Sequence, residues 1–238
     1  MKYMLFTTTA VLTMISALSN AQATIGTSSQ YPRDGDLMPG SPYGYTYHEN
    51  LTEPSNVSGY PFLYDEFKPA QIIFIDNESN PVNLNLNYNM YADFMKIEGT
   101  NLGNQSIQLL PKALNYDILI EGDRFRFVSF SNEGKSVNSY VEIIESYENG
   151  SFLALKRSMK IRKGLNYFKP EFQKTEHFYY INNDGSSFIL ENHEKRISNN
   201  FPDHVKARVE KYIADKNIRF DENLRGLKGV ARYYASLN

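Results

Sequence analysis

The chain has 238 residues, with 25 basic and 27 acidic side chains and a formal net charge of −2. This balance argues against a general nucleic-acid binder, whose surface would be basic. The absence of cysteine excludes disulfides, thiolate metal sites, a cysteine nucleophile and a lipid-modified cysteine. The chain must therefore be held together by its apolar core, and it is long enough to form one.

The first residues have the pattern of an export signal. Lys2 supplies a basic start, Met4–Leu18 is mostly apolar, and residues 19–21 (Ser-Asn-Ala) suit a cleavage site. The apolar run is too short for a membrane-spanning helix, and no other run of that length follows. We expect residues 1–21 to be a signal peptide that is removed, and the rest to be exported to the periplasm or associated with the outer membrane.

The next residues, 22–64, are rich in Gly, Pro, Ser, Tyr and Asn and show no sustained period. They predict an irregular N-terminal arm that lies across the domain or stays mobile. Within this arm, the alternating tyrosines of residues 43–47 are compatible with one short strand.

A β domain is predicted over residues 65–192. Its most regular stretch, Pro81–Ile97, alternates asparagine with apolar residues, which indicates a strand with one buried and one exposed face. A turn is expected before it, at Asn77–Pro81. Further strands are predicted at Gln71–Asp76, Ile107–Leu110, Tyr116–Ile120 and Arg124–Phe130.

A hairpin is predicted over Tyr140–Lys163. The dipeptide Asn149-Gly150 favours a two-residue turn of type I′. Counting outward from that turn places Glu142 directly opposite Arg157. Because opposite charges across a strand pair attract, we expect these two residues to form a structural ion pair.

A second hairpin is predicted over Lys174–Glu191, with Asp184-Gly185 as its turn. The same two-residue geometry would place Ile181 opposite Phe188. Both hairpins have antiparallel neighbours along the chain, so the whole region is expected to form a meander.

The hydrophobic period changes to that of helices in residues 193–238. One helical stripe consists of Val205, Val209, Tyr212 and Ile213, and another of Leu224, Leu227, Val230, Ala231 and Tyr234. The fold class is therefore predicted as α+β. It is a mainly antiparallel sheet of meander and hairpins, with scope to curve or partly close into a barrel, followed by two C-terminal helices that pack on or beside the sheet.

Six different short motifs follow one another along the chain. They are Gly40-Ser41-Pro42-Tyr43, Leu86-Asn87-Tyr88-Asn89 with Tyr91, Leu155-Lys156-Arg157, Asp184-Gly185-Ser186-Ser187, Phe201-Pro202-Asp203 and Tyr233-Tyr234-Ala235-Ser236-Leu237. In this order the chain resembles a family of uncharacterised exported proteins of Bacteroidota. The resemblance implies an envelope location and supplies no catalytic residue. The segment before Gly40-Ser41-Pro42-Tyr43 is longer than the short N-terminal segment that usually precedes this motif in the family.

The asparagines of the central stretch form a candidate ligand surface. Asn83, Asn85, Asn87 and Asn89 share one strand face, and Tyr91 follows them. Asparagine is disfavoured in strands, so this series requires a reason. Hydrogen bonding to a glycan, polar neighbours within the sheet, and a general bias of this chain towards asparagine are three open explanations.

A second candidate surface is cationic. Lys156, Lys160 and Arg162 alternate on one strand face. They suit an anionic partner, such as lipopolysaccharide phosphates or an acidic glycan. They equally suit a solvated edge strand, where lysines prevent sheets from associating.

No cofactor or metal is expected from the sequence. Gly134-Lys135-Ser136 ends like a phosphate-binding loop, but position 129, where that motif needs glycine, is Ser129. The four histidines do not form a recognised zinc motif.

Function is predicted mainly by what is missing, since no coherent catalytic constellation is present. We expect a non-enzymatic exported envelope protein that acts by binding or as an accessory component of a protein assembly. A protein partner in the envelope is expected first. The alternatives are a lipocalin-like or lipoprotein-carrier-like carrier of an apolar ligand, a glycan-binding module, and a hydrolase built from carboxylates such as Asp65, Glu66 and Asp93.

Overall fold

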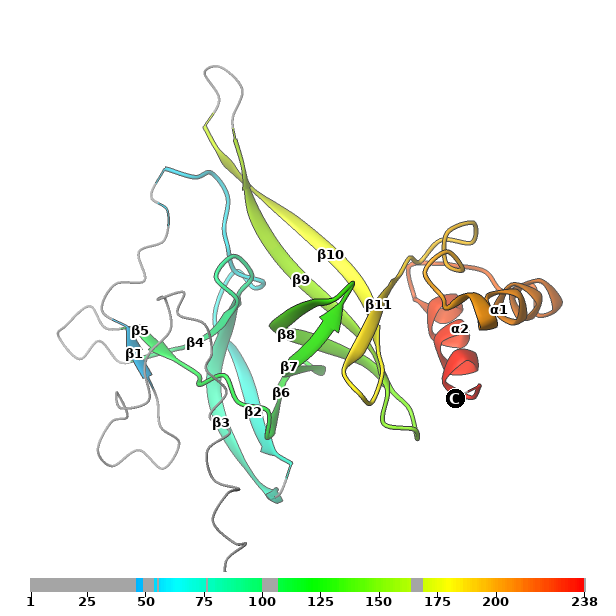
Figure 1. Ribbon diagram of the computed structural model, residues 1–238. Coiled ribbons are helices and arrows are strands. Elements are labelled where there is room, and N and C mark those ends of the chain that lie inside the picture. Colours follow the sequence, from blue (N-terminus) through cyan, green and yellow to red (C-terminus); the bar gives the residue numbers. More distant parts are fainter. Residues whose placement is uncertain are drawn as a thin grey trace, which may run out of the picture.

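The computed structural model describes residues 46–48, 54, 56–75, 77–99, 107–163 and 169–237. The predicted signal peptide and most of the predicted arm lie outside these residues. In the described part, an eleven-stranded sheet is followed by two helices (Figure 1). The predicted fold class is confirmed.

The first six strands form the N-terminal sheet. They are β1 (Thr46–His48), β2 (Lys68–Phe74), β3 (Asn77–Asn89), β4 (Phe94–Ile97), β5 (Ile107–Leu109) and β6 (Tyr116–Ile120). Their order in space is β1-β5-β4-β3-β2-β6, and all these pairs are antiparallel. β1 falls within the predicted arm and overlaps the alternating tyrosines of residues 43–47, which were compatible with one short strand.

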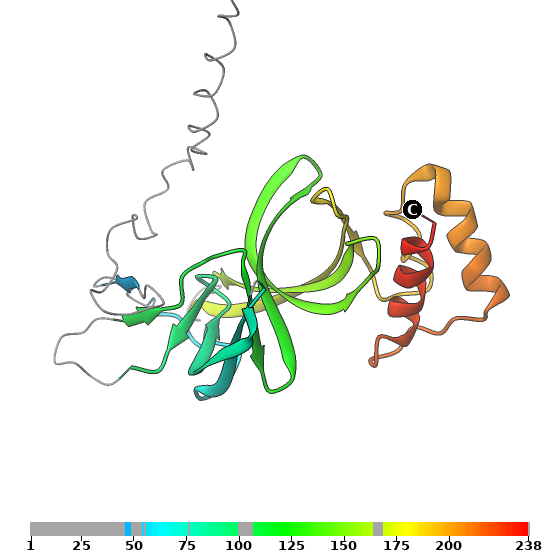
Figure 2. The ribbon, with the colours of Figure 1, turned by 90° about the horizontal axis from the view of Figure 1, so that it is seen from below.

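The remaining elements form a barrel with two helices beside it. The strands are β7 (Asp123–Asn132), β8 (Lys135–Ser146), β9 (Phe152–Arg162), β10 (Glu171–Ile181) and β11 (Ser186–Leu190), and the helices are α1 (Asp203–Asp215) and α2 (Arg225–Ala235). β7 to β11 pair in sequence order, and β11 then pairs in parallel with β7. That closing pair is short, so the ring seen in Figure 2 is a partly closed five-stranded barrel.

The barrel interior is filled by apolar side chains. All five barrel strands contribute to this cluster, whose members are Val128, Phe130, Val141, Ala154, Tyr179 and Ile181, with Val137, Ile143, Phe152 and Ile189 at its border. Small closed barrels leave room for side chains rather than for a ligand. The interior of this barrel is therefore a packed core and not a ligand cavity.

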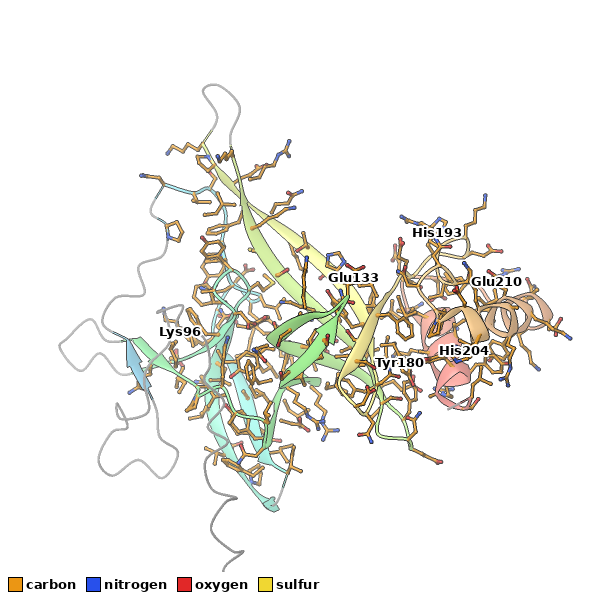
Figure 3. All side chains as sticks on the ribbon, in the orientation of Figure 1. Lys96, Glu133, Tyr180, His193, His204 and Glu210 are labelled. Carbon is orange, nitrogen blue, oxygen red and sulfur yellow. The ribbon has the colours of Figure 1, made fainter. Side chains whose placement is uncertain are left out.

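The helices pack against the outside of the barrel. Their shared core contains Leu153, Tyr180 and Leu190 of the barrel together with Val209 and Leu227 of the helices. Tyr180 lies at the centre of this contact, as Figure 3 shows. Of the two predicted arrangements, the helices thus cover a sheet surface.

The asparagine-rich stretch Pro81–Ile97 is not one strand, contrary to the prediction. β3 already begins at Asn77, within the predicted turn, and ends at Asn89. Residues 90–93 turn the chain, and β4 returns along β3. Asp93 adopts a left-handed conformation with φ of 55°, which ordinary residues adopt mainly in turns. The two-residue alternation persists through the reversal and changes phase only at Met95, so it did not mark the turn itself.

The predicted register of the first hairpin is wrong. The Tyr147 N–H donates to the Ser151 carbonyl, so the loop has three residues rather than two. Gly150 alone has a positive φ, of 79°, and the Asn149 side chain accepts from the Ser151 N–H at 3.1 Å. An irregularity between Ile143 and Glu145 adds a further shift. Glu142 consequently lies opposite Leu155, not Arg157.

The second hairpin also has a three-residue loop in place of the predicted two-residue turn, so its predicted register is wrong as well. The Asn182 N–H donates to the Ser186 carbonyl, and the Asp184 carboxylate accepts from the Ser186 N–H at 2.8 Å. Ile181 therefore lies opposite Ser187 instead of Phe188. Both turns share an Asn or Asp, then Gly, then Ser, and this three-residue form places glycine in the left-handed position.

Candidate functional site

The predicted asparagine surface is divided in two by the segment that precedes β2. Residues 61–67 run alongside the end of β3 that carries Asn87 and Asn89. These two side chains are only 1% and 2% exposed. Asn87 donates to the carbonyl of Tyr64 at 2.7 Å and accepts from its N–H at 3.2 Å. Asn89 accepts from two N–H groups of the following turn, so both asparagines hold backbone rather than a ligand.

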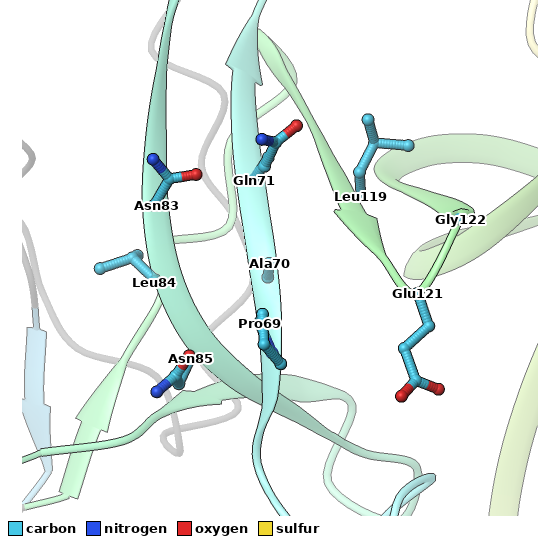
Figure 4. Close-up of a pocket in the computed structure, with 9 residues that line it drawn as sticks. All are labelled: Pro69, Ala70, Gln71, Asn83, Leu84, Asn85, Leu119, Glu121 and Gly122. Carbon is cyan, nitrogen blue, oxygen red and sulfur yellow. The ribbon is translucent and has the colours of Figure 1, made fainter.

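Asn83 and Asn85 lie beyond this cover and are exposed. They line an open groove of about 700 Å³ that runs over β3, β2 and the end of β6 (Figure 4). The lining residues are Pro69, Ala70, Gln71, Asn83, Leu84, Asn85, Leu119, Glu121 and Gly122. Two of the four predicted asparagines therefore belong to one surface cleft.

The register of β2 and β3 gives the groove its chemistry. Gln71 is the direct partner of Asn83, and Pro69 is the partner of Asn85. Three amide side chains thus share one face, because alternate residues of a strand point to the same side. The Asn85 amide donates to Glu98 at 2.6 Å, and no lining residue is aromatic. The groove offers hydrogen bonds and modest apolar contact.

Tyr91 does not belong to this groove. It lies on the turn between β3 and β4, is 39% exposed, and packs edge-on against Phe172 with ring centroids 5.3 Å apart. The structure therefore separates the predicted aromatic member of the ligand surface from the exposed asparagines.

The three predicted cations are also not brought together as one exposed patch. The Lys156 amine points inward and donates to Ser139 at 2.8 Å. Lys160 is exposed, and the Arg162 guanidinium lies 3.5 Å from the Glu171 carboxylate. Only the outer part of this strand face presents cations to solvent.

Glu142 and Arg157 form an ion pair, although their strand register is not the predicted one. Both side chains are mostly buried, and Arg157 also lies 3.2 Å from Glu176. Burial raises the pKa of Glu142 and outweighs the opposing effect of the Arg157 charge. The pair stands one diagonal step apart across the two strands, within the range of a long side chain.

A polar cluster that the sequence analysis missed lies where the N-terminal sheet contacts the barrel. The Asp93 carboxylate accepts from Tyr88 at 2.7 Å, from Lys112 at 2.9 Å and from Ser139 at 3.0 Å. Ser139 in turn accepts from Lys156. The one available sequence signal was the charged residue Asp93 inside an otherwise apolar stretch. The other charged or hydroxyl members of the cluster, Lys112, Ser139 and Lys156, come from three distant segments, and no spacing rule connects these segments.

The described residues contain neither a metal-binding cluster nor a membrane-spanning helix. No three of their His, Asp or Glu side chains gather as metal ligands would. Within the same residues, neither helix has the length and apolar character needed to cross a membrane. Comparisons of the chain with protein-family models, curated proteins and solved structures find no match.

Proposed function

We propose that this chain is an exported, non-enzymatic binding protein of the cell envelope, and that it binds a polar chain such as a glycan in the groove over β3, β2 and β6. Export is supported by the signal-like residues 1–21. Binding is supported chiefly by the groove of about 700 Å³, which is within the size range of small-ligand sites.

The amides of Gln71, Asn83 and Asn85 suit sugar hydroxyls because each amide carries both donors and an acceptor. Each new hydrogen bond contributes on the order of 1 kcal/mol. With one hydrogen bond from each of three amides and no aromatic ring for stacking, the free energy of binding should be about −3 kcal/mol, which corresponds to a Kd of roughly 6 mM. A weak site of this kind gains useful affinity only on a repeating ligand.

The alternative of an apolar-ligand carrier has less support. The space inside the barrel is occupied by its own side chains, and the groove of about 700 Å³ lies on the polar outer face of the sheet. A carrier would keep its ligand through purification. We expect native mass spectrometry of the protein from its own host to give the bare mass, and a stoichiometric lipid adduct would favour the carrier.

The groove is tested by titration of isotope-labelled protein with cello-, xylo- and N-acetylglucosamine oligosaccharides, followed by NMR. We expect saturable shifts in β2 and β3 with at least one series. Asn83→Ala combined with Gln71→Ala should weaken that binding about tenfold, if roughly 1.4 kcal/mol is lost. Asn138→Ala, an exposed asparagine on β8, is the matched control. Shifts that are absent, or that are insensitive to the double variant, would exclude the groove as a glycan site.

A further inference from the structure

The polar cluster lies in a gap between two barrel strands. The β8–β9 ladder extends no further than Glu142 opposite Leu155, whereas β9 continues with β10 to Arg162 (Figure 1). The turn between β3 and β4 fills the space where β8 and β9 part. The Met159 N–H donates to the Met90 carbonyl at 3.0 Å, and the Tyr140 N–H donates to Asp93 at 3.2 Å.

The charges in this gap do not balance. Two amines, of Lys112 and Lys156, are present with the single carboxylate of Asp93. That carboxylate forms its ion pair with Lys112 at 2.9 Å. Among the described residues, Lys156 has no ion-pair partner, and its amine is held by the neutral hydroxyl of Ser139 at 2.8 Å.

The charged and titratable groups facing Lys156 come from every neighbouring element. Asp93 lies on the turn, Lys112 precedes β6, and Tyr88 on β3 donates to Asp93. His177 is the strand partner of Lys156 on β10 and is exposed. Apart from Asp93, none of these groups is an anion at neutral pH, so within the described part of the chain the ammonium form of Lys156 lacks a counter-charge of its own.

We propose that Lys156 is a nucleophilic amine that captures an aldehyde or ketone as an imine. A lysine is activated in this way when it is desolvated beside another cation. Lys156 is half-buried, and Lys112 is its cationic neighbour. Burial is the main cause that lowers the pKa of the Lys156 amine, and the Lys112 charge acts in the same direction against Asp93.

The reaction is balanced with groups that are present. The lone pair of the neutral Lys156 amine attacks the carbonyl carbon, the two amine protons end on the carbonyl oxygen, and this oxygen leaves as water when the C=N bond forms. Ser139 and Asp93 can relay these protons, because Lys156 donates to Ser139 and Ser139 donates to Asp93. Ser139 is only 1% exposed, so it is a positioning residue and not the nucleophile.

The test is reductive alkylation of the full chain with acetaldehyde and sodium cyanoborohydride at pH 7, with each lysine quantified by peptide mass spectrometry. Lys160 is an internal control, since it lies on the same face of the same strand and is exposed. We expect Lys156 to react about tenfold faster than Lys160, because burial lowers the pKa of the Lys156 amine and leaves more of it in the neutral, nucleophilic form. The ratio should fall towards one at pH 10. Equal or slower labelling of Lys156 at pH 7 would overturn the proposal.

Variants of Lys112 test whether the reactivity of Lys156 comes from the charges of the polar cluster or from its accessibility to the reagent. Lys112→Met removes the neighbouring cation and frees Asp93 to pair with Lys156, so the labelling ratio should fall, although the burial of Lys156 keeps it above one. Lys112→Arg keeps the charge and should keep the ratio. Circular dichroism shows whether each variant is folded before labelling. A ratio that is unchanged in folded Lys112→Met would contradict the assigned origin of the reactivity. The groove plays no part in this assay, so its result is independent of glycan binding.

Discussion

The N-terminal sheet and the barrel are both built from alternating strands, but they use their faces differently. In the barrel, one face fills a partly closed interior, and the other packs partly beneath the helices and partly against the N-terminal sheet. In the N-terminal sheet, one face is buried and the other stays open over β3, β2 and β6 as an amide-lined groove. The open region is thus the one suited to a ligand, and the barrel serves as its support.

This difference has a physical origin in the second layer available to each region. Two helices follow the barrel and bring a large apolar surface to cover it. Among the described residues, the outer face of β3 is covered by residues 61–67, which hide Asn87 but leave Asn83 exposed. A sheet face without a partner layer must remain polar. The following predictions test this contrast.

The largest expected effect is in the contact between barrel and helices. Tyr180 is fully buried, and its ring lies 4.8 Å from that of Tyr234 on α2. Tyr180→Ala should lower the free energy of unfolding by about 3–5 kcal/mol, because a large core cavity remains. Urea denaturation measures this. Leu114→Ala is a suitable control, since Leu114 is 60% exposed and should change stability by less than about 0.5 kcal/mol. Similar losses in both variants would contradict a core role for Tyr180.

The buried ion pair comes next. Arg157→Met should cost about 3 kcal/mol in urea denaturation, because it leaves Glu142 buried without its cation. Glu142→Gln should cost less, since Arg157 still has Glu176 at 3.2 Å. Equal stability of Arg157→Met and the unchanged protein would show that the pair does not stabilise the fold.

The same pair predicts a pH dependence. The pKa of Glu142 is raised in the folded protein, so the folded state holds that proton more tightly than the unfolded chain. The contribution of this group to stability therefore improves as the pH falls through the raised pKa. In Arg157→Met the neutral acid no longer needs a cation, and the stability loss should shrink on acidification. A loss that grows at low pH would contradict this sign.

The sequence was sufficient for the fold class because periodicity reports which face of an element is buried. It predicted β6, β7 and both helical stripes, whose members Val205 and Leu227 are buried in the structure. The sequence failed to predict features that hydrophobic periodicity does not report, namely a chain reversal and the lengths of two turns. The reversal at residues 90–93 continues the two-residue pattern, and the three-residue turns at Gly150 and Gly185 contain the same dipeptides as two-residue turns.

The site was predictable only in part for the same reason. Alternation correctly grouped Asn83 with Asn85, but it could not show that residues 61–67 would cover Asn87. It also placed Lys156 beside Lys160 on one face, as the structure does. Whether a lysine on that face is buried depends on Ser139, which contacts Lys156, and on Asp93, which contacts Ser139, and these side chains meet only after the sheet has folded.

The two ends of the asparagine series should respond differently to the same substitution. Asn87→Ala should cost about 1–3 kcal/mol of stability, because it leaves buried backbone groups of Tyr64 without partners. Asn83→Ala should change stability by less than about 0.5 kcal/mol while weakening ligand binding. Thermal denaturation of the two variants gives the comparison. A stability loss at Asn83 as large as that at Asn87 would show that the groove end is structural as well.

The smallest expected effect concerns the turn that joins β8 to β9. Asn149 accepts from the Ser151 N–H at 3.1 Å and donates to the Ala235 carbonyl of α2 at 3.2 Å. Asn149→Asp keeps the acceptor, as Asp184 does in the second turn, and should change stability by less than about 0.5 kcal/mol. Asn149→Ala removes both bonds and should cost about 1 kcal/mol in urea denaturation. If Asp were as costly as Ala, the bond to α2 and not the turn would be the main contribution of Asn149, and the barrel and helices would be coupled through this loop as well as through Tyr180.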